Sequence, residues 1–134
     1  MPAYDYALVR AVHVPTGDAL AVGVVLQCRQ AGFLDTRLGD GRDAAVRLAL
    51  DAELLARALR AFARVASGDP AAGPVARLPP SERFHFLTAT RSTSLQTSPT
   101  RTGLADDPAR ALDRIAAALA DLDVAGTRPP APGV

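Results

Sequence analysis

The chain contains no lysine and no tryptophan, and it has only one cysteine and two histidines in 134 residues. The single cysteine, Cys28, cannot form an internal disulfide, and no cluster of cysteines and histidines could bind zinc. Without lysine there is no phosphate-binding loop of the Walker type, and the motifs Gly-x-Ser-x-Gly and His-Glu-x-x-His are absent too. These absences disfavour a conventional hydrolase or metalloenzyme, and we expect no cofactor.

A strong charge of one sign is also missing. All 15 basic residues are arginine, and 14 acidic residues offset them to a net charge of +1. This balance argues against bulk electrostatic binding to nucleic acid, although a local basic patch is compatible with it. The planar guanidinium pairs well with carboxylates and phosphates, so single arginines are candidates for anion binding.

Neither a secretory leader nor a long apolar run is visible, so we expect a cytoplasmic protein with no membrane association. The length fits a single domain, which we place at residues 1–126, with Gly126 ending the last helix. Residues 127–134 are rich in proline, and we expect them to form a disordered tail.

Alternating apolar residues predict an N-terminal antiparallel hairpin, with strands at residues 4–14 and 19–29 and a turn at residues 15–18. In the second strand, the spacing of two predicts one shared face that contains Leu20, Val22, Val24, Leu26 and Cys28. Gly23 interrupts this strand, which indicates a β-bulge or a close approach by another backbone or a ligand.

Residues 33–38 predict a third strand, and residues 43–66 predict a short helix followed by a longer one that Asp51 caps. We expect an irregular connection at 67–83, partly extended chain at 84–97 and a loop at 98–103. Asp106 or Asp107 then caps a final helix whose apolar stripe contains Leu112, Ile115, Ala116, Leu119 and Leu122. This order predicts an α+β fold, in which the hairpin extends to a small antiparallel sheet and two main helices pack on one face.

One segment, between Glu82 and Gly103, concentrates hydroxyl, amide and guanidinium groups. Either Arg91 or Arg101 could clamp a phosphate or carboxylate through two parallel hydrogen bonds. The alternative is that these side chains satisfy the local backbone, as serine and threonine often do in turns. The candidate binding residues are Gly23, His85, Arg91, Ser92, Gln96, Ser98, Arg101, Thr102 and Gly103.

Several motifs resemble a bacterial family known as domain of unknown function 3037. They are Tyr4-x-Tyr6-Ala7-x-Val9-Arg10, Val22-Gly23-Val24-Val25-Leu26, Ala72-Gly73-Pro74, Glu82-Arg83-Phe84-His85, Arg91-Ser92-Thr93, Gln96-Thr97-Ser98-Pro99 and Thr102-Gly103-Leu104. The resemblance covers roughly residues 4–122 and implies no established activity. It implies asparagine at position 21 and histidine at position 101 in many members, where this chain has Ala21 and Arg101. It also implies a possible protein partner, a kinase-like protein of the HipA type.

Three hypotheses follow for the function. The first is a non-enzymatic binding or accessory domain that contacts a partner protein or an anionic ligand through residues 91–103, beside Gly23 and the hairpin. The second is an enzyme acting on a phosphorylated or nucleotide substrate, with His85 as the base and Arg91 as the anion clamp. The third is a module that binds single-stranded nucleic acid through Tyr4, Tyr6 and arginines on one sheet face; the net charge makes nucleic acid the weakest of these partners.

Overall fold

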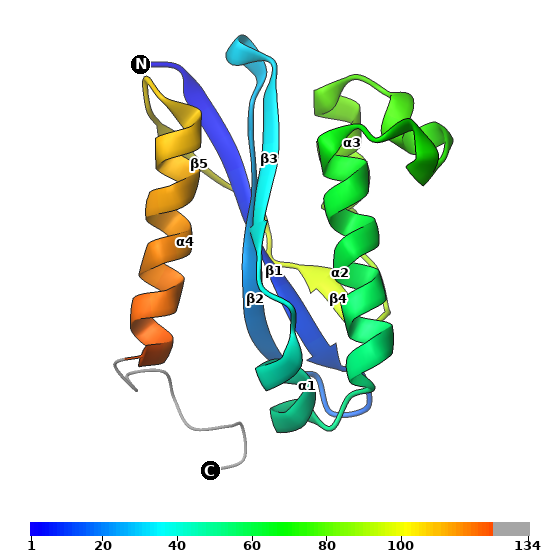
Figure 1. The fold of residues 1–134 in the computed structure, drawn as a ribbon. Coiled ribbons are helices and arrows are strands. Elements are labelled where there is room, and N and C mark those ends of the chain that lie inside the picture. Colours follow the sequence, from blue (N-terminus) through cyan, green and yellow to red (C-terminus); the bar gives the residue numbers. More distant parts are fainter. Residues whose placement is uncertain (125–134) are drawn as a thin grey trace.

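A computed structural model of the chain describes residues 1–124, with side chains through residue 120. It shows a five-stranded antiparallel sheet that separates one helix, α4, from the other helices (Figure 1). The α+β class predicted from the sequence is therefore confirmed. The predicted helix end at Gly126 and the predicted tail at residues 127–134 lie outside the described residues, as does the side chain of Leu122.

The sheet is built around the predicted hairpin. Strands β1 (Ala3–His13) and β2 (Asp18–Cys28) pair along their whole length, and β3 (Phe33–Leu38) pairs with β2. Two short strands, β4 (Leu95–Thr97) and β5 (Arg101–Leu104), pair with the other edge of β1. The first strand is thus the point where the N-terminal hairpin meets the polar segment near residue 100.

A β-bulge lies where Gly23 predicted one. Val9 is opposite Gly23, but Arg10 is opposite Ala21, so Val22 is the extra residue in β2. A Cβ atom on Gly23 would come within 2.6 Å of Leu38 Cδ2 on β3 and would also overlap the β3 backbone. Glycine at this position is therefore required by the close approach of a neighbouring strand.

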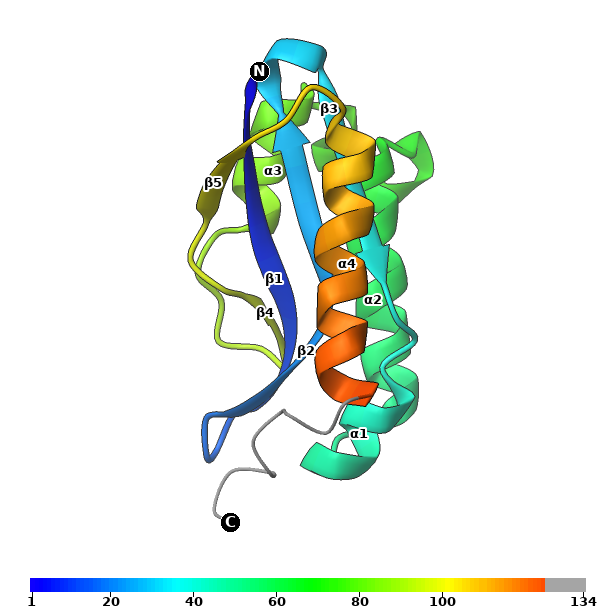
Figure 2. The ribbon, with the colours of Figure 1, turned by 90° about the vertical axis from the view of Figure 1, so that its left-hand side faces the viewer.

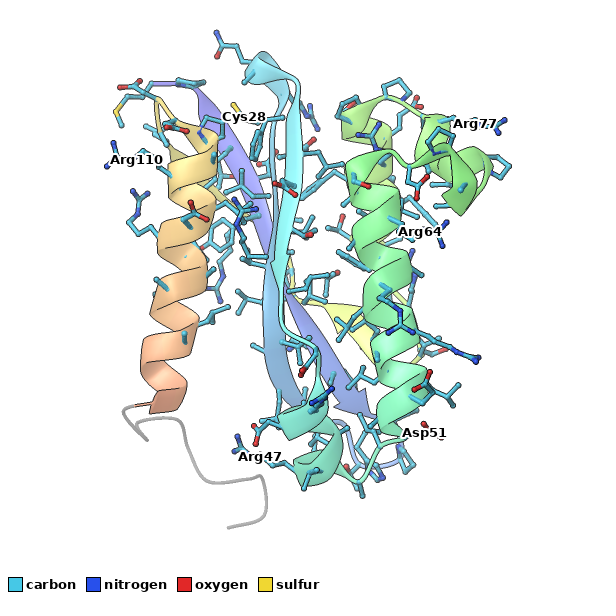
Figure 3. All side chains as sticks on the ribbon, viewed as in Figure 1. Cys28, Arg47, Asp51, Arg64, Arg77 and Arg110 are labelled. Carbon is cyan, nitrogen blue, oxygen red and sulfur yellow. The ribbon has the colours of Figure 1, made fainter. Side chains whose placement is uncertain are left out.

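The bulge changes the faces predicted for β2. Leu20 and Val22 pack on the side of α1, α2 and α3, whereas Val24, Leu26 and Cys28 pack on the opposite side. The prediction that all five share one face is wrong, because one extra residue in a strand reverses the alternation beyond it. Cys28 is 1% exposed and lies between the sheet and α4, where it packs as a small buried apolar residue (Figure 3).

The helices begin where the caps predict. Helices α1 (Arg42–Leu48) and α2 (Ala52–Ser67) are separate, and the Asp51 carboxylate accepts the Leu54 N–H at 3.0 Å (Figure 3). Helix α4 (Pro108–Val124) starts after Asp107, whose carboxylate accepts two N–H groups of its first turn. Local capping chemistry is therefore sufficient to find these starts.

The two main helices do not share a face. Helix α2 packs with α1 and α3 on one side of the sheet, while α4 packs on the other side (Figure 1). The sheet consequently has two core clusters, and β2 contributes apolar residues to both. The predicted one-sided arrangement is corrected, since the central strand is buried on both faces.

The middle of the chain also differs from prediction. Residues expected to be irregular or extended form helix α3 (Pro80–Leu87), preceded by 3-10 turns at Pro70–Ala72 and Pro74–Arg77. Phe84 and Leu87 on one side of α3 are buried in the core. Part of the predicted loop at 98–103 is strand β5, because pairing with β1 imposes an extended conformation there.

Candidate functional site

One face of the sheet is only partly covered. Helix α4 packs mainly on β2 and β3, and β1, β4 and β5 lie beside it without a helix in front of them (Figure 2). The side chains of Tyr6, Leu8 and Arg10 project on this side of β1, and all three are half-buried. A sheet surface with this mixture of aromatic, aliphatic and cationic groups is a candidate binding surface.

Cross-strand pairing adds three neighbours to this surface. Arg101 is opposite Tyr6, and both Gln96 and Ala21 are opposite Arg10, on either side of it. Directly opposite residues in antiparallel strands point to the same face. We define the open sheet face as Tyr6, Leu8, Arg10, Ala21, Gln96 and Arg101.

The charged side chains of the open sheet face are all positive. None of its six side chains is acidic, and neither Arg10 nor Arg101 forms an ion pair or side-chain hydrogen bond with another described residue. Arg101 is exposed, but the Nε of Arg10 is buried without a partner within residues 1–124. Buried polar atoms are normally paired, so this orphaned donor is a candidate contact point for a ligand.

Arg91, the predicted anion clamp, has a local role. Its guanidinium donates to the carbonyls of Phe86 at 2.6 Å and Leu87 at 2.9 Å, and it lies 4.8 Å from the centre of the Phe86 ring. These bonds satisfy carbonyls at the C-terminus of α3 that have no partner within the helix. The alternative that these side chains satisfy the local backbone, left open from the sequence, therefore describes Arg91 best.

The other polar candidates divide between backbone and surface. Ser98 is buried and accepts the Leu8 N–H at 2.9 Å, so it fixes the join between β1 and β4. The Gln96 amide donates to the Thr93 carbonyl at 2.8 Å while the side chain stays half-exposed on the open sheet face. Ser92 is exposed.

Two predicted binding residues on β5, Thr102 and Gly103, contact residues of β1 instead. Gly103 lies beneath Tyr4, and a Cβ atom there would overlap the tyrosine ring. Tyr4 is consequently only 7% exposed, with its ring centre 6.0 Å from that of Tyr6. Thr102 points to the opposite face, where its hydroxyl donates to Asp5 at 3.0 Å.

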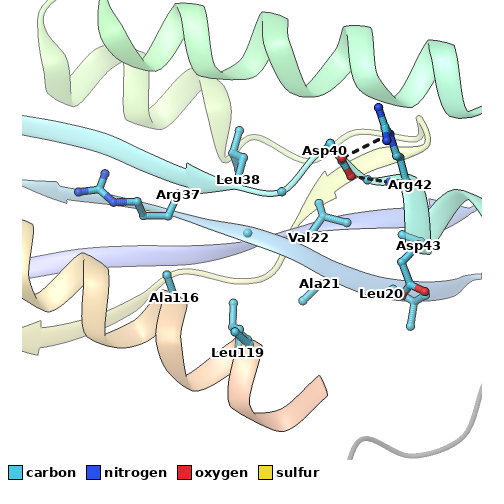
Figure 4. Close-up of a pocket in the computed structure, with 15 residues that line it drawn as sticks. Leu20, Ala21, Val22, Arg37, Leu38, Asp40, Arg42, Asp43, Ala116 and Leu119 are labelled. Atoms are coloured by element: carbon cyan, nitrogen blue, oxygen red, sulfur yellow. Dashed lines mark hydrogen bonds and ion pairs between the residues drawn. The ribbon is translucent and has the colours of Figure 1, made fainter. Parts of the chain in front are cut away.

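A cavity of about 450 Å³ lies beside the bulge, between α4, the end of β3 and the start of α1 (Figure 4). Gly23 lines it, together with Ala21, which also belongs to the open sheet face. None of the predicted residues from 85 to 103 lines it. Gly23 on β2 and the 91–103 segment therefore lie beside opposite edges of β1. The open sheet face extends between them.

Arg37 lies at one end of the cavity and is held in place by two carboxylates. It bonds to Asp35 at 2.9 Å and to Asp113 of α4 at 2.8 Å. The hydrogen bond with Asp35 raises the pKa of Arg37, against the opposing effect of partial burial. Because its guanidinium bonds to a carboxylate on each element, this arginine links α4 to β3.

His85, the proposed base, is exposed on α3 and does not line the cavity. Within the described part of the chain, no group of three or more histidine, cysteine and acidic side chains is arranged to hold a metal ion. No helix among these residues combines the length and apolar character needed to cross a membrane.

The fold and surface define a small α+β domain with a two-sided core and one sheet face left partly open. A family model described as "Protein of unknown function (DUF3037)" matches residues 6–120, so the chain belongs to this family, as its motifs predicted. No curated protein matches the chain, and neither does any solved structure. Ala21 and Arg101, where the resemblance implied asparagine and histidine in many members, both belong to the open sheet face.

Sequence reasoning missed Arg10 and Leu8 as surface residues. Both lie in the predicted first strand, but their exposure depends on where α4 packs and on which strands pair with β1. One signal was present: Arg10 interrupts the apolar pattern of a strand that is otherwise suited to burial.

Proposed function

We propose that this protein is a non-catalytic binding domain whose binding surface is the open sheet face. The observation that carries the proposal is that α4 packs mainly on β2 and β3 and covers β1, β4 and β5 only in part. Tyr6, Leu8 and two arginines without an ion pair among the described residues project there. Tyrosine and arginine are the residues most often found at the energetic centre of protein interfaces. The polar segment 91–103 contributes through Gln96 and Arg101.

A partner protein is the favoured occupant. Apolar side chains make up half of the open sheet face, which suits a protein surface better than a highly charged ligand. The family resemblance offers one candidate, a kinase-like protein of the HipA type. We expect a site inside the cell for this interaction.

The enzyme hypothesis receives less support. Its two residues do not converge, because Arg91 is committed to the carbonyls of α3 and His85 is exposed on the outside of that helix. A general base and an anion clamp must face one substrate position to act together.

Binding of single-stranded nucleic acid is a second candidate because two tyrosines and two arginines do share one sheet face. Of the two tyrosines, Tyr6 is half-buried, whereas Tyr4 is buried between Gly103 and the core cluster on the α4 side. Stacking proteins usually combine several exposed aromatics with a continuous basic groove. The open sheet face therefore fits this function less well.

The test compares two variants with the same change of charge. Leu8→Asp/Arg101→Gln alters the open sheet face, and Val46→Asp/Arg57→Gln alters exposed residues of α1 and α2 on the other side of the sheet. Each tagged variant is expressed in native cells, and co-purifying proteins are quantified by mass spectrometry against the wild type. We expect specific partners to be lost only with the first variant. Recovery of the same partners by both folded variants would show that binding does not use this face.

A further inference from the structure

The geometry points to Arg10 as the anchor for a carboxylate of the partner, held beside an apolar side chain that enters the neighbouring cavity. This inference rests on the proposed function and deepens it, because it names the partner's chemistry: a segment of another protein in which an aspartate or glutamate lies near a large apolar residue. Arg10, Ala21 and the cavity are the features that carry it.

The surroundings of Arg10 suit an anion. Its Nε is buried, and it has no partner among the described residues. Neither cross-strand neighbour bonds to it: Ala21 is apolar, and the Gln96 side chain bonds to the Thr93 carbonyl. A buried donor atom is costly when unpaired, and a carboxylate is the partner that the guanidinium fork fits best.

An apolar part of the cavity wall is adjacent to Arg10, and the charged residues Arg37, Asp40, Arg42 and Asp43 also line the cavity. Ala21 lies directly opposite Arg10 in the sheet, with Cβ atoms of such pairs about 5 Å apart. On its other side, Ala21 lines the cavity with Ala116 and Leu119 of α4 (Figure 4). A cavity of about 450 Å³ is large enough for an apolar side chain of any size. One short segment can therefore reach both the guanidinium and the cavity.

The charges of this surface favour a protein over a nucleic acid. The open sheet face has two unpaired cations and no acidic side chain, so it complements a partner with one or two carboxylates. A nucleic acid would require several phosphate contacts, while the surroundings of Arg10 are mainly apolar, with Leu8 on the same strand and Ala21 opposite. The net charge of +1 is consistent with this assignment.

The experiment selects ligands for the intact chain from a displayed library of random 16-residue peptides. Selected peptides are synthesised, and their affinities are measured by fluorescence polarisation. We expect them to share an acidic residue close to a large apolar residue. Arg10→Gln should weaken binding at least tenfold, as should replacing the peptide's acidic residue by its amide, and the two changes together should weaken it no further than either alone. The matched control, Arg57→Gln, should bind as the wild type does.

Other results would separate this inference from the proposed function. Peptides that are lost with Leu8→Asp/Arg101→Gln but bind equally to Arg10→Gln would overturn the Arg10 anchor and leave the open sheet face as the binding surface. Peptides insensitive to both variants would overturn both proposals. A fluorescein-labelled 20-nucleotide single strand could also bind in a way that depends on Arg10. That result would overturn the carboxylate as the group bound by Arg10 and assign a phosphate in its place.

A stability measurement keeps the test independent of folding. Because Arg10 makes no described ion pair or side-chain hydrogen bond, Arg10→Gln should be at least as resistant to urea as the wild type. A clear loss of stability in this variant would show that Arg10 has an intramolecular role, and the inference would fail.

Discussion

Replacing Arg91 by alanine should destabilise the fold and leave binding unaffected. Helix α3 has only eight residues, and its C-cap, Thr88, is not in the left-handed conformation that usually ends a helix. The Arg91 side chain instead reaches back to the last carbonyls, donating to Phe86 and Leu87. Without it, the Phe86 carbonyl keeps only a long bond of 3.4 Å from the Ala89 N–H, and the Leu87 carbonyl loses its side-chain donor.

The size of the effect follows from the contacts. Two hydrogen bonds from a partly exposed guanidinium stabilise by roughly 1 kcal/mol each. Stacking of Arg91 on Phe86, at 4.8 Å, adds about 0.5–1 kcal/mol. The expected loss in the free energy of unfolding is therefore about 2–3 kcal/mol, which lowers the urea midpoint by roughly 1.5 M for a chain with an m value of about 1.5 kcal/mol/M.

The assay is urea unfolding followed by circular dichroism, with Arg101→Ala as the comparison. Arg101 is exposed and makes no described ion pair, so its removal should change the unfolding free energy by less than about 0.5 kcal/mol. Arg91→Lys keeps one donor and should fall between the wild type and Arg91→Ala. Equal stability of Arg91→Ala and the wild type would refute the assignment of Arg91 to the end of α3.

Three further predictions test the packing and the charges. Gly23→Ala should cost about 1–3 kcal/mol, because the new methyl group meets the backbone of β3 at Leu38, and a normal urea midpoint would contradict this. Gly103→Ala should force the Tyr4 ring from its place, so tyrosine fluorescence and the midpoint should both change; a variant identical to the wild type would show that β5 can move away. The pKa of Asp69 is lowered, first by a backbone N–H and then by an arginine, so its stabilisation is complete above its ordinary value of 3.8 and is lost as the pH falls through the folded-state value. The stability difference between the wild type and Asp69→Asn should therefore shrink in acid, and a difference constant from pH 7 to pH 2 would contradict this.

Elements with strong local signals could be predicted from the sequence. The alternation of apolar residues and a short turn identify the hairpin, and Asp51 and Asp107 identify the starts of α2 and α4. Helix α3 could not be found this way. Its aromatic residues have weak helix propensity, and it is held by burial of Phe84 and by Arg91, which lies outside the helix.

The open sheet face depends on contacts between distant parts of the chain. Pairing of Arg101 with Tyr6, and of Gln96 with Arg10, joins residues that are far apart in sequence, and no local pattern specifies this register. The composition of the 91–103 segment correctly marked polar residues near this surface. It could not distinguish Arg101, which is exposed, from Arg91 and Ser98, which are bound to backbone.

The most direct test of the binding surface is site-specific photo-crosslinking in native cells. A photoreactive benzoylphenylalanine is placed at Leu8, in the centre of the open sheet face, or at Arg60, on the exposed side of α2. We predict a crosslinked partner from position 8 and none from position 60, with the crosslink from position 8 weakened when Arg101→Gln is added. Crosslinks from position 60 with none from position 8 would contradict the assignment and locate the binding surface on the other side of the sheet.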